Sequence, residues 1–153
     1  MSLRRCHTPS GRESSNMKNI FPRTVFASLS VAAIIAATPG LAADGIEAMA
    51  FLRREGIYAD ARRPDLILLD LNLPKMDGRE VLALIKKDQY LKIIPTIILT
   101  TSDSEADIQI SYQLQANCYL RKPAHWDAFD NLVKSINAFW LTRAKLPQMP
   151  RNR

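Results

Sequence analysis

Short apolar runs alternate with amphipathic segments from residue 44 into the 140s. Two runs, at 66–69 and 96–100, are unbroken and bounded by turn residues, which is typical of strands buried on both faces of a parallel sheet. A third short run covers 116–121. Helical periodicity predicts four helices, at 44–56, from Gly78 to about Asp88, at 105–115 with Ser102 or Ser104 as candidate N-cap, and from Trp126 into the 140s. This alternation favours an α/β fold with a parallel sheet and helices on both faces.

Three polar side chains stand at the ends of the three predicted strands. Asp70 directly follows the first strand, Thr100 ends the second, and Lys122 follows the third. Right-handed crossovers place the carboxyl ends of parallel strands at one edge, so we expect the three side chains to meet there. Each of them alone has an ordinary structural explanation, as a turn former, a strand residue or a solvated lysine. Their shared position favours a common chemical task.

A carboxylate, a hydroxyl and an ammonium at one sheet edge are suited to phosphoryl chemistry. The carboxylate can attack phosphorus and form an aspartyl phosphate. The ammonium can neutralise the phosphoryl oxygens, and the hydroxyl can hydrogen-bond one of them. A hydrolase that uses Asp70 has little support, because no well-placed histidine accompanies it and His125 fits a helix start better. We therefore expect a phosphoacceptor and not an enzyme.

The first 43 residues differ in character from the rest. Residues 1–16 are polar and predicted to be disordered. From Met17, basic residues precede an apolar stretch at 25–37, and small residues follow it, which is the layout of a secretory signal peptide. The same stretch can instead be a strand, because periodicity alone does not separate the two. Docked beside 66–69, residues 31–36 would cover an apolar sheet edge that is otherwise an aggregation hazard.

Composition and charge narrow the classes of function. The chain has 153 residues, of which 47% are hydrophobic and 24% charged, as in an ordinary globular domain. Its net charge of +6 lies mostly in residues 1–43, which carry five Lys/Arg and one acid, whereas residues 44–153 carry sixteen Lys/Arg and fourteen acids. We therefore expect no nucleic-acid partner. Two distant cysteines, Cys6 and Cys118, indicate neither a disulfide framework nor a zinc site.

Four motifs resemble those of a known family. LLDLNLPKMDG at 68–78, ILTTS at 98–102, CYLRKP at 118–123 and DGIEAM at 44–49 resemble the receiver domains of response regulators in two-component signalling. The segments ANCYLRKP and FWLTRAKLP are similar to small single-domain regulators paired with phytochrome-type sensor kinases. The resemblance implies a flavodoxin-like fold, N-terminally truncated. The expected domains are a start at 1–43, a partial receiver at 44–146 and a loose tail at 147–153.

The resemblance also implies a role for each matching residue. Asp70 would be the phosphoacceptor for a histidine kinase. Thr100 would be the switch hydroxyl, and Lys122 would pair with the phosphoryl group. Tyr119 would be the switch aromatic that reports the state of Thr100, and Pro123 would follow a cis peptide bond.

The chain departs from the family at the metal site. Asp70 and the backbone carbonyl of Asn72 would bind Mg²⁺, but the family's acidic pair at the end of the first strand is missing. No carboxylate lies between Glu13 and Asp44. Asp44 and Glu47 are the nearest substitutes, and we expect them to lie too far away. Since Mg²⁺ needs an octahedral oxygen shell, we expect impaired phosphotransfer to Asp70.

Taken together, the sequence predicts a cytoplasmic receiver module of a phosphorelay whose output is by protein contact. Its expected partners are a sensor histidine kinase, with a phytochrome-type kinase as one candidate, and a second copy bound through the last helix and strand. The alternative is a non-phosphorylatable or exported interaction protein derived from a receiver. A membrane is involved only if residues 25–37 act as a signal or an anchor.

Overall fold

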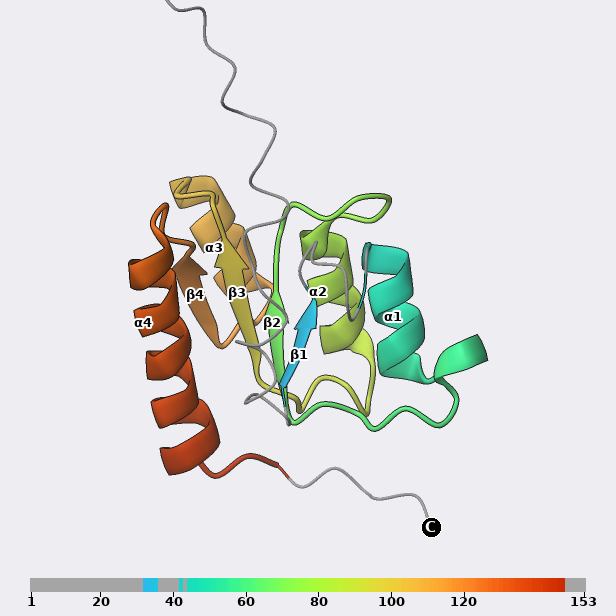
Figure 1. Ribbon diagram of the computed structural model, residues 1–153. Helices are drawn as coiled ribbons and strands as arrows, with labels where there is room; N and C mark the ends of the chain where they lie inside the picture. The colour runs from blue at the N-terminus through green and yellow to red at the C-terminus, as the bar shows by residue number, and fades with distance from the viewer. Residues whose placement is uncertain (1–31, 36–41, 43, 148–153) are drawn as a thin grey trace, which may run out of the picture.

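The computed structural model describes residues 32–35, 42 and 44–147, and its helices and strands alternate as the sequence predicts (Figure 1). The helices and strands are β1 (Ala32–Ile35), α1 (Gly45–Arg53), β2 (Leu66–Leu69), α2 (Gly78–Lys87), β3 (Thr96–Thr100), α3 (Glu105–Gln113), β4 (Cys118–Arg121) and α4 (Trp126–Ile136). A short 3-10 turn at Gly56–Tyr58 follows α1, and α4 continues in π-helical geometry over Asn137–Arg143.

The four described strands form one parallel sheet in the order β1-β2-β3-β4. In β1, Ala32 lies opposite Leu66 and Ile35 lies opposite Leu69. The hypothesis that this apolar segment docks beside residues 66–69 as a strand is therefore confirmed for residues 32–35. Most of the signal-like segment, the start at 1–16 and the last six residues lie outside the described residues.

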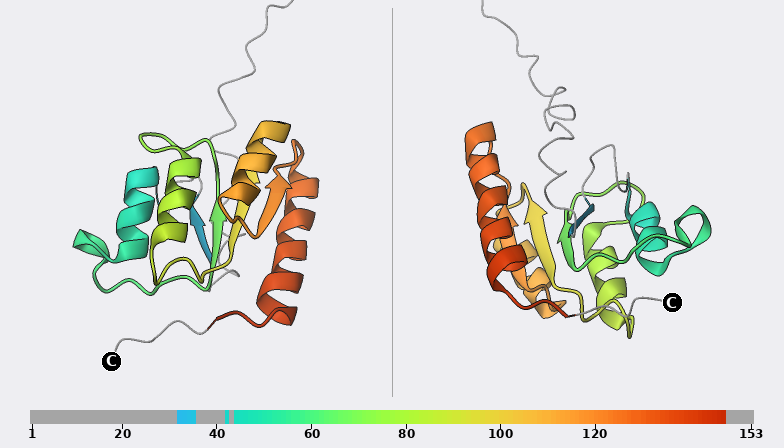
Figure 2. Two further views of the ribbon diagram at one scale, coloured as in Figure 1. Left: turned by 180° about the vertical axis from the view of Figure 1, so that it is seen from behind. Right: turned by 60° about the horizontal axis from the view of Figure 1, so that its bottom comes forward.

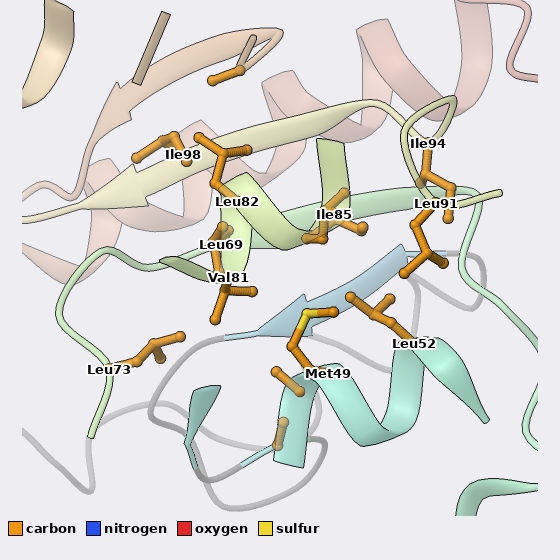
Figure 3. Packing of buried hydrophobic residues seen from close by; sticks show 14 of the residues in the cluster. Met49, Leu52, Leu69, Leu73, Val81, Leu82, Ile85, Leu91, Ile94 and Ile98 are labelled. Atoms are coloured by element: carbon orange, nitrogen blue, oxygen red, sulfur yellow. The ribbon is translucent and has the colours of Figure 1, made fainter. Parts of the chain in front are cut away.

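Each face of the sheet carries its own core, because successive side chains of a strand point to opposite faces. On one face, Ile67 and Leu69 pack against residues of α1 and α2 (Figure 3). On the other, Leu66 and Leu68 pack in a cluster with residues of α4. Figure 2 shows the result, in which α1, α2 and α3 lie on one side of the sheet and α4 on the other. This is the flavodoxin-like arrangement with helices on both faces.

The helices differ in how they are capped and anchored. The Asp44 side chain accepts a hydrogen bond from the Glu47 N–H and caps α1, and the Asp77 side chain accepts from the Arg79 N–H and caps α2. Buried apolar residues anchor α2 and α4 to the sheet. By contrast, the side chain of Ser104, the N-cap of α3, makes no capping hydrogen bond.

Two further observations concern the described part of the chain. No helix in it is long and apolar enough to cross a membrane. No peptide bond among the described residues is cis, so the prediction of a cis bond before Pro123 is wrong.

Candidate functional site

Asp70 and Lys122 meet at the carboxyl edge of the sheet. Asp70 follows β2 and is 8% exposed. Lys122 follows β4, and its Nζ donates to Asp70 Oδ2 at 2.5 Å. The backbone N–H of Asn72 donates to Asp70 Oδ1 at 3.0 Å. Both carboxylate oxygens therefore have a donor, which offsets the loss of water around a nearly buried charge.

Thr100 lies at the same edge, at the end of β3 between the strands that carry Asp70 and Lys122. It is fully buried. The side-chain amide of Asn72 donates to Thr100 Oγ1 at 3.4 Å, so one residue contacts both Asp70 and Thr100. The carboxylate, hydroxyl and ammonium that the sequence placed at three strand ends thus share one edge.

The turn after Asp70 depends on a close approach of two backbone segments. The Gly78 N–H donates to the Leu71 carbonyl at 2.9 Å. A Cβ atom on Gly78 would lie 2.1 Å from the Asp70 carbonyl oxygen and 2.6 Å from Leu71 Cα. Glycine is therefore required where α2 begins, because these neighbours are backbone atoms that cannot rotate away.

Tyr119 in β4 reaches the loop that follows Thr100. Its hydroxyl donates to the Ser102 carbonyl at 2.9 Å, and the Ser102 N–H donates to Thr100 Oγ1 at 3.4 Å. Burial raises the pKa of the Tyr119 hydroxyl above its usual range, although the bond to Ser102 opposes this. The aromatic side chain is thus connected to Thr100 through Ser102.

Among the described residues, the oxygen ligands near Asp70 are too few for a Mg²⁺ site. Within the described ranges, no group of three or more His, Cys, Asp or Glu residues is placed to hold a metal. Asp44 accepts from Lys75 Nζ at 2.5 Å, and Glu47 accepts from the Tyr58 hydroxyl at 2.5 Å. The bond from Lys75 is the main reason that the pKa of Asp44 lies below its usual range. Both substitute carboxylates therefore serve structural contacts.

A second polar cluster lies beside the site and was not foreseen from the sequence. Asp107 accepts from Arg79 Nη2 at 2.5 Å and from Ser102 Oγ at 2.6 Å. The Ser102 hydroxyl and the Arg79 guanidinium hold the pKa of Asp107 below its usual range. In the sequence, Asp107 is an ordinary acid of a helix's first turn, and nothing connects it with Arg79, which lies 28 residues earlier.

The fold and this edge of the sheet define a receiver. The response regulator receiver domain model matches residues 35–137, and the chain belongs to that family. It is a receiver of the two-component phosphorelay type, and it is similar to single-domain regulators.

Comparisons with individual proteins place it near cyanobacterial phytochrome response regulators. It is 53% identical over 104 residues to "Response regulator Rcp1" of Synechocystis sp., covering 68% of this chain and 71% of that protein. The solved structure of the phosphorylated cyanobacterial phytochrome response regulator RcpA is 60% identical, with a TM-score of 0.68, over 69% of this chain and 75% of that one. The Mn²⁺-bound form of Rcp1 is 52% identical, with a TM-score of 0.67, over 69% and 76%.

Proposed function

We propose that this receiver accepts a phosphoryl group on Asp70 from a sensor histidine kinase. The observation that carries the proposal is the pairing of Asp70 with Lys122 at the sheet edge where Thr100 ends β3. A carboxylate beside a cation suits attack on phosphorus, because the carboxylate can act as the nucleophile and the cation can stabilise the charge on the phosphoryl oxygens.

The proposed step transfers the phosphoryl group from a phosphohistidine. An oxygen of Asp70 attacks phosphorus, the phosphorus–nitrogen bond breaks, and its electron pair stays on the imidazole, which takes up a proton. Lys122 then neutralises the phosphoryl oxygens of the acyl phosphate. Thr100 accepts from Asn72 and Ser102 at 3.4 Å, so its own hydroxyl hydrogen remains to donate to one of these oxygens as the side chain turns toward the phosphoryl group. Tyr119, bound to Ser102, responds to that change.

We propose that this transfer is slower than in receivers with a complete metal site. Asp70 and the Asn72 carbonyl are the two protein ligands expected for Mg²⁺, and the described residues supply no acidic pair beside them. Lys122 is left to screen the approach of the phosphoryl group to Asp70. Without a divalent cation, electrostatic stabilisation of the transferred group is weaker.

We further propose a phytochrome-type kinase as the partner, because two similar solved structures are named as a cyanobacterial phytochrome response regulator and a bacteriophytochrome response regulator. We therefore also propose a cytoplasmic location, where a sensor kinase would donate the phosphoryl group. Output would be by protein contact, including a homodimer through β4 and α4. Phe139, in the continuation of α4, is 56% exposed and offers an apolar contact on that side.

The second candidate is a receiver-derived interaction protein that is not phosphorylated, or one that is exported. The missing acidic cluster in the described part of the chain favours it. Export is suggested by the signal-like layout at 17–43, but cleavage near Ala43 would remove β1, which pairs with β2. An N-terminus at Ala43 or Asp44, found by sequencing the expressed protein, would support export.

Phosphoramidate, a small donor, separates the two candidates without requiring the kinase. The full chain is incubated with phosphoramidate and Mg²⁺, and its intact mass is followed over hours. We expect one added phosphoryl group, stable in acid and lost in base, in the wild-type protein and in Asp60→Asn, which removes an exposed carboxylate. Asp70→Asn should show none. Equal labelling of Asp70→Asn, or no labelling of the wild type, would refute the proposal.

A further inference from the structure

Helix α3 has no fully buried apolar side chain of its own, although Leu114, its C-cap, packs against the core. Its one buried residue is Ser111, whereas α2 buries Val81, Leu82 and Ile85. Two large apolar side chains of α3 point outward, since Ile110 is 39% and Tyr112 is 51% exposed. Burial of an apolar side chain contributes about 1.5–3 kcal/mol, so α3 lacks the stabilisation that anchors α2.

Polar contacts of one residue, Asp107, connect α3 to its neighbours. Its Oδ1 accepts from Arg79 Nη2 on α2, and its Oδ2 accepts from Ser102 Oγ in the loop after β3. Asp107 and Arg79 are 18% and 29% exposed, so water screens this pair only in part. Arg79 is itself fixed, because its Nη1 donates to both oxygens of Asp77 at 3.1 and 2.8 Å.

The same contacts lead back to the sheet edge. Ser102 donates its N–H to Thr100 and accepts a bond from Tyr119 through its carbonyl, while its hydroxyl holds Asp107. A continuous series of hydrogen bonds therefore joins Thr100 to α3 and α2. Such contiguous polar networks can carry coupling between distant groups, and mutation of their members measures it.

We propose that Asp107 is a positioning residue that clamps α3 to the receiver through Arg79 and Ser102. When these contacts break, α3 detaches as a unit while the sheet stays folded. The clamp consists of Arg79, Ser102 and Asp107. Phosphorylation of Asp70 would loosen Ser102 and so release the clamp. This consequence rests on the proposed function. The clamp itself does not, because the contacts form with Asp70 unmodified.

Hydrogen exchange of the full chain, measured by mass spectrometry without any phosphodonor, tests the clamp. Asp107→Asn removes the charge and one acceptor oxygen. Glu105→Gln is the matched control, since it also removes a carboxylate from the first turn of α3 but leaves the clamp intact. We expect α3 amides to exchange about tenfold faster in Asp107→Asn than in Glu105→Gln, because charge-assisted hydrogen bonds are lost. Amides of β2, β3 and α4 should keep their wild-type protection.

Arg79→Gln should reproduce the effect, and the double variant Arg79→Gln/Asp107→Asn should be no worse than the more severe single variant. Equal exchange of α3 in Asp107→Asn and Glu105→Gln would overturn the clamp. If Asp107→Asn exposed the sheet together with α3, α3 would be part of one cooperative unit and its separate release would be disproved. Since Asp70 is never modified, a failure here leaves the proposed phosphotransfer unaffected, and the reverse also holds.

Discussion

Gly78→Ala tests how tightly the Asp70 turn is built. The backbone of Gly78 is not in the left-handed region, so alanine suits it conformationally and the penalty is steric. An added Cβ would lie 2.1 Å from the Asp70 carbonyl oxygen, whereas ordinary contacts begin at 3.4 Å. Either α2 or the Asp70 backbone must therefore move by about 1.3 Å, the difference between these two distances.

The magnitude follows from two opposing effects. Overpacking of this kind destabilises by about 1–3 kcal/mol, and replacing a helical glycine by alanine returns up to about 1 kcal/mol. Because the clash is with backbone atoms, we place the overpacking effect at its upper end. We therefore expect Gly78→Ala to lower the free energy of unfolding by about 2 kcal/mol. Urea unfolding followed by the fluorescence of Trp126 and Trp140 measures it.

Gly56→Ala is the matched control. Gly56 has φ +58° and no atom within 4 Å of an added Cβ, so its penalty is conformational and about 1 kcal/mol. We expect Gly78→Ala to be the more destabilising variant and to slow labelling of Asp70 by phosphoramidate. A Gly78→Ala protein as stable as Gly56→Ala, or more stable, would refute the steric argument.

Three further predictions follow from the same contacts. Lys122→Met leaves the nearly buried Asp70 carboxylate without its cation and should lower the free energy of unfolding by about 1–3 kcal/mol, measured in urea. Adding Asp70→Asn should restore most of the lost stability. If the destabilisations of the two single variants simply add in the double variant, the pairing of Asp70 with Lys122 is contradicted. The folded pKa of Asp107 lies below its unfolded value, so its stabilisation is complete above about pH 4 and is lost as pH falls through the folded pKa. The difference in unfolding free energy between the wild type and Asp107→Asn should accordingly shrink on acidification. A difference that grows would contradict a stabilising role of the ionised Asp107 carboxylate. Millimolar Mg²⁺ should leave the melting temperature unchanged, because the described residues supply no acidic cluster; a Mg²⁺-dependent rise would show a metal site.

Local sequence signals predicted the strands and most of the site well. Buried strands of four or five apolar residues are bounded by turn residues here, so the ends that carry Asp70 and Thr100 could be located directly. The N-terminal strand was harder, because Ala32–Ile35 has the same apolar composition as a signal-peptide core. The pairing with β2 shows that these four residues form a strand, and it decides between strand and signal peptide for them alone.

The contacts that sequence reasoning missed are polar and long-range. Ser102 was a candidate N-cap, but the N-cap of α3 is Ser104, and the Ser102 hydroxyl donates to the Asp107 carboxylate while it accepts from the Ser104 N–H. Arg79 bonds Asp107 across 28 positions, and no spacing rule connects residues on separate helices. The π-helical continuation at Asn137–Arg143 also has no breaker residue that would predict it.

The identity of the phosphorylated residue tests phosphotransfer to Asp70. After incubation with phosphoramidate, borohydride reduces an acyl phosphate to the corresponding alcohol, so a modified aspartate becomes homoserine and peptide mass spectrometry locates it. We expect homoserine at position 70 and at no other aspartate. Homoserine at Asp44 or Asp77 with Asp70 unchanged, or none anywhere after prolonged incubation, would contradict it.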